Sequence, residues 1–443
     1  MNKTGSDFTK GNLYKKFILY SLPFMLTNIT QIIYPLIDMA VIGKTGGSET
    51  MNSISSAGQI YSLFTIIGTG FCAGGQIYIS EAVGSSQKKE LYNIACLIFI
   101  SSTVLSFFVT VFSIVTRTAT LEFIGISDDI LEKADEYFRI ICFSFVPIYA
   151  YNAAFAIMRG LGKSVQPFVV TAISLAVKLL SDFILASYNM LNPQNLGITT
   201  LVSNIIALAV TLLYFLKISK NAFSQSEKLC FKKEQLFSLL KLSVPLAMRS
   251  AAVNISRVFA TKTVSGLDEQ LRAAFAISIR AEETVNKLSQ GVTYASSSVI
   301  GQNNSAGNSS RVKQAVQIAW TECTVIYAAI ALLFIFSPQF VFKIFLKDSS
   351  VTAYASKFAA AMLISFPAMI ISRGTNGYIQ GTGKSGLCFL IAVLDGIIFR
   401  LGLCYLFGRV FSLGYFGYFL GYTVSAYAGA IPGLIYYKYK TKR

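Results

Sequence analysis

The chain has 443 residues, of which 53% are hydrophobic and only 13% are charged, and its mean hydropathy is +0.57. Apolar side chains in this amount exceed what one water-soluble core can bury, so the composition excludes a soluble protein and predicts an integral membrane protein. The net charge of +17 is spread over short loops. No basic domain is long enough to bind nucleic acid.

About twelve apolar segments of roughly 20 or more residues follow one another along the chain. We predict an all-α membrane protein with transmembrane helices near 15–42, 52–83, 91–115, 135–158, 165–188, 196–216, 238–262, 270–300, 314–336, 353–376, 386–407 and 414–437. Alternate loops and both chain ends collect most of the lysines, whereas one opposite loop is acidic around Asp128 to Glu136. This bias predicts that both termini are cytoplasmic in a multi-pass protein of a bacterial-type inner membrane.

The first predicted span combines two prolines with a carboxylate. Pro23 lies near its start, and Pro35 precedes Asp38 by three residues. A proline inside a helix removes one backbone hydrogen bond, so Gln31 loses its usual donor and the helix bends more easily there. We predict a hinge at Pro23 and Pro35; the alternative is that the two prolines shape a static cavity. Asp38 has no partner in its own span, so its counter-charge comes from another helix or is a proton.

The fifth predicted span carries a lysine and an aspartate. Lys178 and Asp182 are four residues apart, so they share one helix face and can meet directly. An ionisable group inside a span costs about 2.5–3.5 kcal/mol on insertion scales, which makes each retained one a functional candidate. The two residues form either a structural ion pair or, together with Asp38, a site that couples transport to a cation.

A six-residue motif occurs twice in the chain. Arg159-Gly-Leu-Gly-Lys-Ser164 returns as Gln380-Gly-Thr-Gly-Lys-Ser385, and a long apolar run follows each copy. Neither copy fits a phosphate-binding loop, because the glycine required five positions earlier is Ile157 or Tyr378. Internal repeats in a membrane protein are typical of secondary transporters. We predict an N-terminal six-helix lobe at 1–216, a cytoplasmic linker at 217–234 and a C-terminal six-helix lobe at 235–443.

Several segments together resemble one transporter family over essentially the whole chain. They are Pro23 through Asp38 to Gly43, Gly70 to Gly84, the first copy of the repeated motif with Pro167, and Val299-Ile-Gly-Gln-Asn303 with Ala306-Gly-Asn308. Their order and spacing resemble the multidrug and toxic compound extrusion (MATE) transporters. The resemblance implies two six-helix lobes around a central cavity, and antiport in which entry of a sodium ion or proton drives export of a small molecule, commonly an amphipathic organic cation.

The resemblance also implies a cation site in the N-terminal lobe. The acidic residue of the family's first helix matches Asp38, and the aspartate of its fifth-helix pattern matches Asp182, whereas the asparagine of that pattern is Lys178 here. An ammonium group donates hydrogen bonds and cannot coordinate a metal. A lysine between the two carboxylates would take the place of a bound sodium ion, which favours a proton as the coupling ion.

The C-terminal lobe departs further from the family. Some members place carboxylates at the positions of Val253 and Met369, so the resemblance implies no second cation site and is closest to the branch whose carboxylate site lies in the N-terminal lobe alone (DNA-damage-inducible-F-like). The same lobe is rich in basic residues, with Glu283, Glu322 and Asp395 as further partners. The candidate residues of a substrate cavity are Tyr34, Gln31, Tyr151, Asn152, Asn204, Arg249, Arg257, Arg280, Glu282, Arg373 and Arg400.

The predicted function is secondary active antiport. The protein would export small organic molecules across the cytoplasmic membrane as a monomer, without a cofactor, driven by a proton or sodium gradient. The alternative is a flippase or exporter of an anionic or lipid-linked substrate, because arginine suits carboxylate and phosphate groups; each arginine is otherwise an interhelical ion pair or a snorkelling end. A channel or receptor would need a continuous polar pore or a sensor domain, and neither is visible. The chain has no histidine, and no pattern predicts an enzyme.

Overall fold

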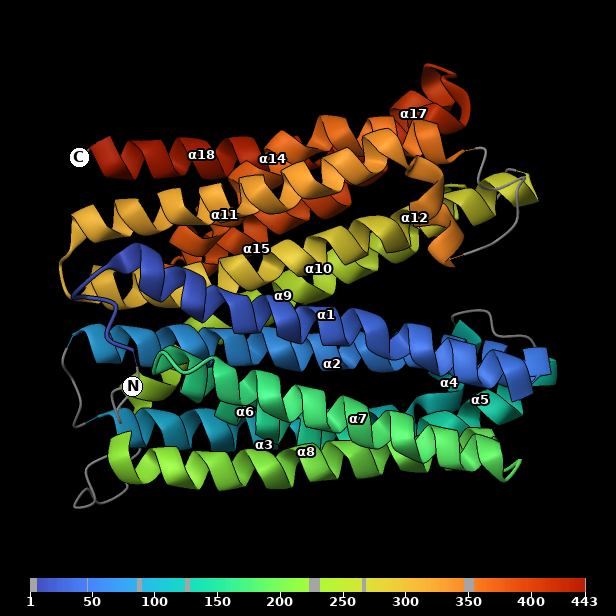
Figure 1. Ribbon diagram of the computed structural model, residues 1–443, viewed down its shortest axis with the longest axis horizontal. Helices are drawn as coiled ribbons and strands as arrows, with labels where there is room; N and C mark the ends of the chain where they lie inside the picture. The colour runs from blue at the N-terminus through green and yellow to red at the C-terminus, as the bar shows by residue number, and fades with distance from the viewer. Residues whose placement is uncertain are drawn as a thin grey trace. The chain divides into compact units, whose positions relative to one another are not determined.

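The computed structural model describes residues 6–45, 47–85, 90–123, 128–222, 232–264, 268–345 and 354–442, and the side chains of 34–52 lie outside the described part. Every regular element in these ranges is helical. In chain order the elements (Figure 1) are α1 (Leu13–Thr45), α2 (Gly47–Gly84), α3 (Leu91–Val115), α4 (Arg117–Phe123), α5 (Asp128–Ile141), η1 (Cys142–Ser144), α6 (Phe145–Gly160), α7 (Val165–Ser187), α8 (Pro193–Ala222), α9 (Lys233–Thr263), α10 (Glu269–Ser305), α11 (Ser309–Phe336), α12 (Pro338–Phe345), α14 (Ala355–Gly381), α15 (Ser385–Val393), η2 (Leu394–Phe399), α16 (Arg400–Tyr405), η3 (Leu406–Val410), α17 (Gly414–Val424) and α18 (Ala426–Lys442).

Nine helices of the described residues are long and apolar enough to cross a membrane. They coincide with nine of the predicted spans. The predicted span at 270–300 is the single helix α10, which carries several charged side chains and for that reason is less apolar than the nine. The predicted span at 414–437 is divided into α17 and α18. Helix α1 runs unbroken through Pro23 and Pro35.

The acidic stretch at 128–136 is not a loop, which differs from the prediction. Its residues form α5, which continues through η1 into α6, so that one helical span covers Ile130–Gly160. Ala134, Tyr137, Phe138 and Ile141 are buried on one side of α5. Their spacing of three or four residues is that of an amphipathic helix. The charged residues Glu132, Asp135 and Glu136 are not among the buried ones.

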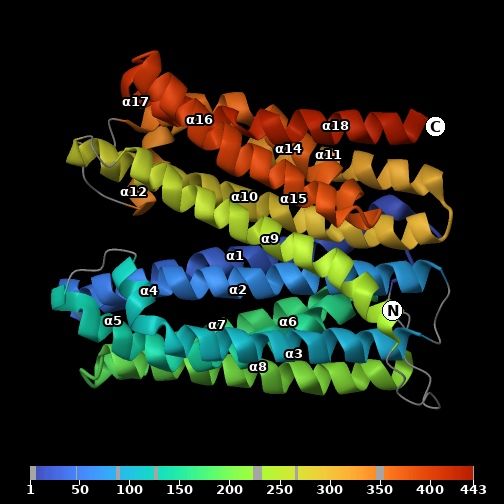
Figure 2. The same cartoon turned by 180° about the vertical axis from the view of Figure 1, so that it is seen from behind.

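The described contacts divide the chain into two compact units. Unit 1 comprises Met1–Asp7 and Leu26–Ala247, and unit 2 comprises Phe8–Met25 and Met248–Arg443. Helices α1 and α9 therefore contribute residues to both units. In unit 1, α6 packs against α2, α3 and α8; in unit 2, α14 packs against α10, α11 and α18 (Figures 1 and 2). The described ends of the predicted linker at 217–234 are helical, since α8 extends to Ala222 and α9 begins at Lys233.

The repeated motif ends a helix in each unit. Gly162 has a φ of +78° and Gly383 a φ of +73°, a left-handed conformation that glycine adopts without strain. Behind Gly162, the N–H of Lys163 donates to Met158 O at 2.8 Å; behind Gly383, the N–H of Lys384 donates to Ile379 O at 2.9 Å. This is the Schellman arrangement, which satisfies carbonyl groups at a helix C-terminus.

The other glycine of the motif allows two helices to touch. A Cβ on Gly160 would lie 2.6 Å from Ile79 of α2, and a Cβ on Gly381 would lie 2.7 Å from the carbonyl oxygen of Ser297 of α10. Helices α6 and α14 are thus held against α2 and α10 by the same device. The motif serves packing and helix termination, and no strand precedes either copy in the described residues.

Gly74 provides a test of helix packing inside unit 1. A Cβ on Gly74 of α2 would lie 2.4 Å from the Cα of Ser243 on α9, whereas a Cβ on Gly58 of the same helix meets nothing within 4 Å. We expect Gly74→Ala to lower stability by about 1–3 kcal/mol, because the backbone of α9 must shift. Gly58→Ala should be neutral or slightly stabilising, since alanine favours a helix by up to about 1 kcal/mol. Unfolding temperatures of the two purified variants in detergent check this; equal values would contradict the close contact.

Candidate functional site

A buried ion pair lies on α7 in unit 1. Lys178 Nζ donates to Asp182 Oδ2, and the two side chains are each about 1% exposed. On the neighbouring helix α8, Thr199 Oγ1 donates to Asp182 Oδ1 at 2.7 Å. Both carboxylate oxygens of Asp182 are therefore engaged, one by an ammonium group and one by a hydroxyl.

The ion pair occupies an unusual place on its helix. The buried residues of α7 are Pro167, Val170, Lys178 and Asp182, so the two charged side chains form most of the face that α7 turns to the interior. Two charges taken out of water are costly unless their geometry and hydrogen bonds compensate them. Here the spacing of four residues on α7 lets the two charges meet, and the hydroxyl of Thr199 satisfies the second carboxylate oxygen. Sequence analysis did not predict Thr199 as a site residue; the one signal for it was its position in the predicted span 196–216.

A second polar cluster lies one to two turns along α8. Asn204 Nδ2 donates to Thr200 O at 2.8 Å and lies 3.4 Å from the hydroxyl oxygen of Tyr61, while the Tyr151 hydroxyl donates to Asn204 Oδ1 at 3.4 Å. Two of the predicted cavity residues, Tyr151 and Asn204, are thus in contact. Asn152 is not part of the cluster, because its amide donates to Ile148 O of its own helix.

The structure describes only some of the predicted site residues on α1. The side chains of Tyr34, Pro35 and Asp38 lie outside the described residues. Pro23 is buried and Gln31 is exposed. Whether Asp38 contacts the ion pair on α7 stays a prediction.

Unit 2 contains a buried charge network centred on Glu282 of α10. Glu282 Oε2 lies 3.6 Å from Arg257 Nη2 and accepts from the Tyr422 hydroxyl at 3.4 Å, while its Oε1 accepts from Asn286 Nδ2. Glu282 is 2% exposed. Three helices, α9, α10 and α17, therefore contribute to one cluster through this carboxylate. Asn286 and Tyr422 were not predicted; the spacing of four residues from Glu282 could have indicated Asn286, whereas Tyr422 reaches Glu282 only when the helices pack.

Arg257 and its neighbours extend the network at one side. Arg257 Nη1 lies 3.7 Å from Glu283 Oε1, and Lys287 Nζ lies 3.2 Å from the same oxygen. Glu283 and Lys287 are four residues apart on α10, as neighbours on a helix face are. The side chain of Glu283 is 31% exposed, against 3% for Glu282.

Arg400 extends the network at the other side. Its Nη1 donates to the Tyr422 hydroxyl at 3.1 Å, and its Nη2 lies 3.6 Å from Asp395 Oδ1. Asp395 and Arg400 are five residues apart, one position too many for partners on an α-helix. The intervening residues 394–399 form a π-helical turn, in which the hydrogen bonds run from i to i+5. This local widening brings the two charges together.

The remaining predicted arginines differ in their surroundings. Arg373 of α14 donates to Asn286 Oδ1 and has no carboxylate within 4 Å among the described residues. Arg249 of α9 is half-buried, and it likewise lacks such a carboxylate in the described part of the chain. Arg280 is exposed. Of the arginines predicted as one cavity, Arg257 and Arg400 are therefore paired with carboxylates, whereas Arg373 and Arg249 have no carboxylate within 4 Å in the described residues.

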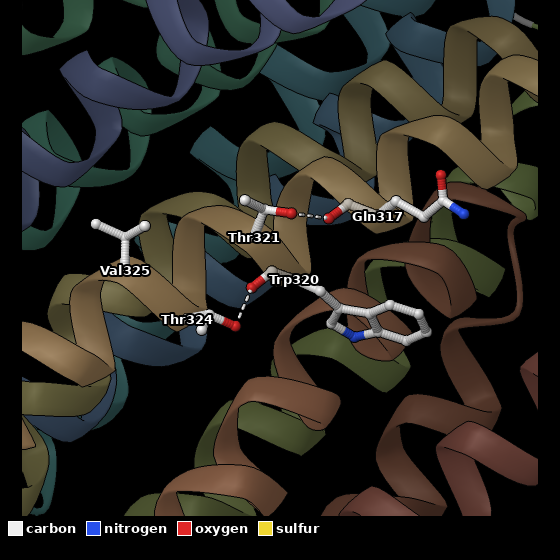
Figure 3. Close-up of a pocket in the computed structure, with 5 residues that line it drawn as sticks. All are labelled: Gln317, Trp320, Thr321, Thr324 and Val325. Carbon is white, nitrogen blue, oxygen red and sulfur yellow. Dashed lines mark hydrogen bonds between the residues drawn. The ribbon is translucent and has the colours of Figure 1, made fainter.

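A groove lies along the outer face of α11. Figure 3 shows its lining residues, Gln317, Trp320, Thr321, Thr324 and Val325. The hydroxyls of Thr321 and Thr324 donate to carbonyl oxygens of their own helix, and Trp320 Nε1 donates to Ile371 O of α14 at 3.2 Å. Since the donors of Trp320, Thr321 and Thr324 are satisfied within the protein, the Gln317 amide is the polar group that these five lining residues offer, and the charged clusters are the stronger candidates for function.

Comparison with known proteins gives one consistent result. A family model described as MatE matches residues 23–184 and 245–406. The multidrug export protein MepA of Staphylococcus saprophyticus is 22% identical over 393 residues, which cover 88% of this chain and 86% of that protein. The probable multidrug resistance protein YoeA of Bacillus subtilis is 22% identical over 369 residues, 81% of this chain and 79% of that protein.

Solved structures of other proteins are similar to this one over almost the whole length of the chain. An outward-facing multidrug resistance MATE family transporter has a TM-score of 0.91 at 19% identity, and a MATE in the bent conformation has a TM-score of 0.90 at 18% identity; each comparison covers 98% of this chain and 97% of the other. At such identity the likeness concerns the fold. The predicted all-helical membrane fold with two lobes is confirmed.

Proposed function

This chain belongs to the MatE family, and we propose on that premise that it is a secondary active antiporter that exports small organic molecules across a cytoplasmic membrane. Family members are multi-pass membrane transporters and not enzymes. The two compared relatives are named for multidrug export and multidrug resistance. We extend to this chain the export of small organic molecules, without a choice among individual compounds.

We further propose that the driving ion is a proton and that the ion pair on α7 is part of the coupling site. The observation that carries this is the engagement of both oxygens of Asp182, one by Lys178 and one by Thr199. A sodium ion needs oxygen ligands, and an ammonium group supplies none. Lys178 thus takes the role of a fixed cation beside Asp182. The exchangeable charge is a proton, and we assign it to Asp38.

The proposed cycle uses α1 as its two-state element. Protonation of Asp38 removes a negative charge from the N-terminal lobe, and its release restores that charge, so each state favours a different arrangement of the helix. Pro23 and Pro35 lower the free energy needed to bend α1 from one of these arrangements to the other. A solved relative described in a bent conformation is compatible with such a change.

The proposal also covers the two lobes, the orientation in the membrane, the oligomeric state and the branch of the family. The lobes at 1–216 and 235–443, joined by a linker at 217–234, are the two moving bodies. Both termini are cytoplasmic, as the distribution of lysine and arginine indicates. The transporter works as a monomer. Within the family we place the chain in the branch with a carboxylate site in the N-terminal lobe alone, because Val253 and Met369 stand at the other acidic positions.

Proteoliposome efflux with sodium and pH gradients imposed separately tests the coupling ion. We expect the wild type to respond to the pH gradient alone, and Lys178→Asn to become responsive to sodium, because an amide oxygen replaces the ammonium group as a ligand. Lys287→Asn is a matched control, since Lys287 is also paired with a carboxylate four residues away but in unit 2; its ion dependence should not change. Sodium-driven efflux by the wild type at fixed pH, abolished in Asp38→Asn, would contradict the proposal.

A second candidate is export of an anionic or lipid-linked molecule. It is favoured by Arg373 and Arg249, which have no carboxylate partner among the described residues. Guanidinium groups bind carboxylate and phosphate in a bidentate manner. Anionic probes in the same efflux assay, compared with cationic dyes, decide between the two substrate classes.

A further inference from the structure

Glu322 is a carboxyl group inside a membrane span and apart from the charge network of unit 2. It lies on α11, in the apolar helix Ser309–Phe336, where an ionisable side chain costs about 2.5–3.5 kcal/mol on insertion scales. The side chain is only partly exposed. From the sequence, Glu322 was a candidate partner for the arginines of the C-terminal lobe, but the structure pairs it with none of them.

The contacts of Glu322 are few. Its Oε1 lies 3.0 Å from the hydroxyl oxygen of Ser21, which belongs to the part of α1 that packs in unit 2. Its Oε2 is buried and has no hydrogen-bond partner among the described residues. An ionised carboxylate in this position would have one hydroxyl donor in place of a cation, so its charge would be poorly compensated.

The hydroxyl of Ser21 has two oxygen neighbours. Its oxygen lies 3.2 Å from Ile18 O as well as 3.0 Å from Glu322 Oε1. A serine hydroxyl has a single hydrogen to donate and two lone pairs to accept with, and a backbone carbonyl oxygen only accepts. A protonated Glu322 fits this geometry by donating to Ser21 Oγ while Ser21 donates to Ile18 O; an ionised Glu322 would have to share the single Ser21 hydrogen with Ile18 O in a three-centre bond.

Several charged side chains on the packed helices are engaged elsewhere. Helix α11 packs against α10, α12 and α14, and Ser21 links it to α1. Arg373 of α14 binds Asn286, Glu282, Glu283 and Lys287 of α10 belong to the Glu282 network, and Lys16 of α1 donates to Lys10 O. The other titratable groups of these elements are Tyr14, Lys15, Tyr20, Tyr34, Asp38 and Lys44 on α1, Glu269, Arg272, Arg280 and Tyr294 on α10, Arg311, Lys313, Cys323 and Tyr327 on α11, Lys343 on α12, and Lys357 and Tyr378 on α14. No cation lies within 4 Å of the Glu322 carboxyl in the described residues.

We propose that Glu322 is a second proton-binding carboxyl of this transporter, which holds the N-terminal part of α1 through Ser21 when protonated and releases it when ionised. The inference rests on the proton-coupled export proposed above and adds a titrating group to it. Ser21 and Asp38 lie on the same helix, on either side of Gln31. Protons at Glu322 and at Asp38 would therefore act on the two ends of α1.

Carbodiimide labelling of the full-length protein in lipid tests this directly, because the reagent modifies protonated carboxyl groups in apolar surroundings. We expect peptide mass spectrometry to find Glu322 labelled at low pH, with the labelled fraction falling as pH rises. Glu283 is the matched control: it is paired with Arg257 and Lys287 and should stay unlabelled. The infrared carbonyl band of a protonated carboxylic acid should lose intensity in Glu322→Gln and not in Glu283→Gln.

The pH dependence of efflux provides the second part of the test. A single titrating group changes its ionised fraction by up to about tenfold per pH unit, so Glu322→Gln, which keeps the shape and cannot ionise, should flatten that part of the pH profile. Ser21→Ala leaves the carboxyl in place and should shift the pH midpoint of labelling. A pH profile of Glu322→Gln identical to wild type, or Glu322 unlabelled at every pH, overturns the inference. Labelling of Glu322 in a protein without pH-driven efflux supports the inference and overturns the proposed function.

Discussion

Asp182→Ala is expected to destabilise the protein by about 3–5 kcal/mol, because it removes the carboxylate that pairs with a buried lysine. Lys178 is 1% exposed and its ammonium cannot reach water without a change in α7. The hydroxyl of Thr199 would lose its acceptor as well. Export driven by a pH gradient should be lost together with stability, since the proposed coupling site contains this pair.

Three variants in detergent separate the pair from its surroundings. Asp182→Ala should lower the unfolding temperature strongly, whereas Lys178→Met combined with Asp182→Leu should recover most of it, because no charge is left buried. Asp135→Ala breaks the more exposed pair with Arg117 and should cost no more than about 1 kcal/mol. Equal unfolding temperatures for Asp182→Ala and Asp135→Ala would contradict the buried pair. The double variant, stable but inactive in efflux, would show that the charges serve coupling.

Glu282→Ala is expected to have the largest effect in unit 2, again about 3–5 kcal/mol. Glu282 is the carboxylate that contacts Arg257, Tyr422 and Asn286, so its removal leaves Arg257 with Glu283 alone. The half-buried arginine then lacks its nearest carboxylate.

The adjacent carboxylate supplies the control for Glu282. Glu283→Ala removes a side chain that is 31% exposed and leaves the contacts of Glu282 in place, so we expect a loss of no more than about 1 kcal/mol. Unfolding temperatures of both variants, measured in the same detergent, compare the two positions on one helix. If Glu283→Ala were the more damaging of the two, Glu282 would not be the centre of the network.

The ion pairs show what local spacing can and cannot predict. Lys178 and Asp182 were predicted to meet because they are four apart on a helix, and they do. Asp395 and Arg400 meet although they are five apart, because the chain forms a π-helical turn between them. Tyr422 and Thr199 join the clusters from other helices, and no sequence pattern relates residues that are brought together only by packing.

The repeated glycine motif shows the same division. Its duplication was evident from the sequence and indicated two related bundles. The role of the motif was not evident from the sequence, because a glycine that ends a helix cannot be distinguished there from one that lets a neighbouring helix approach. The structure distinguishes them: Gly162 has a φ of +78°, and Gly160 packs against Ile79.

The sequence by itself determined that this is a helical membrane protein with an internal repeat and few charges inside its spans, because hydropathy and spacing are properties of single segments. Only the tertiary structure decided which of those charges are compensated. A buried charge is defined by partners on other helices: Thr199 for Asp182, Tyr422 for Arg400, and for Glu322 a single serine on α1. That difference separates the compensated charges of the buried ion pairs from the carboxyl that we propose to bind and release a proton.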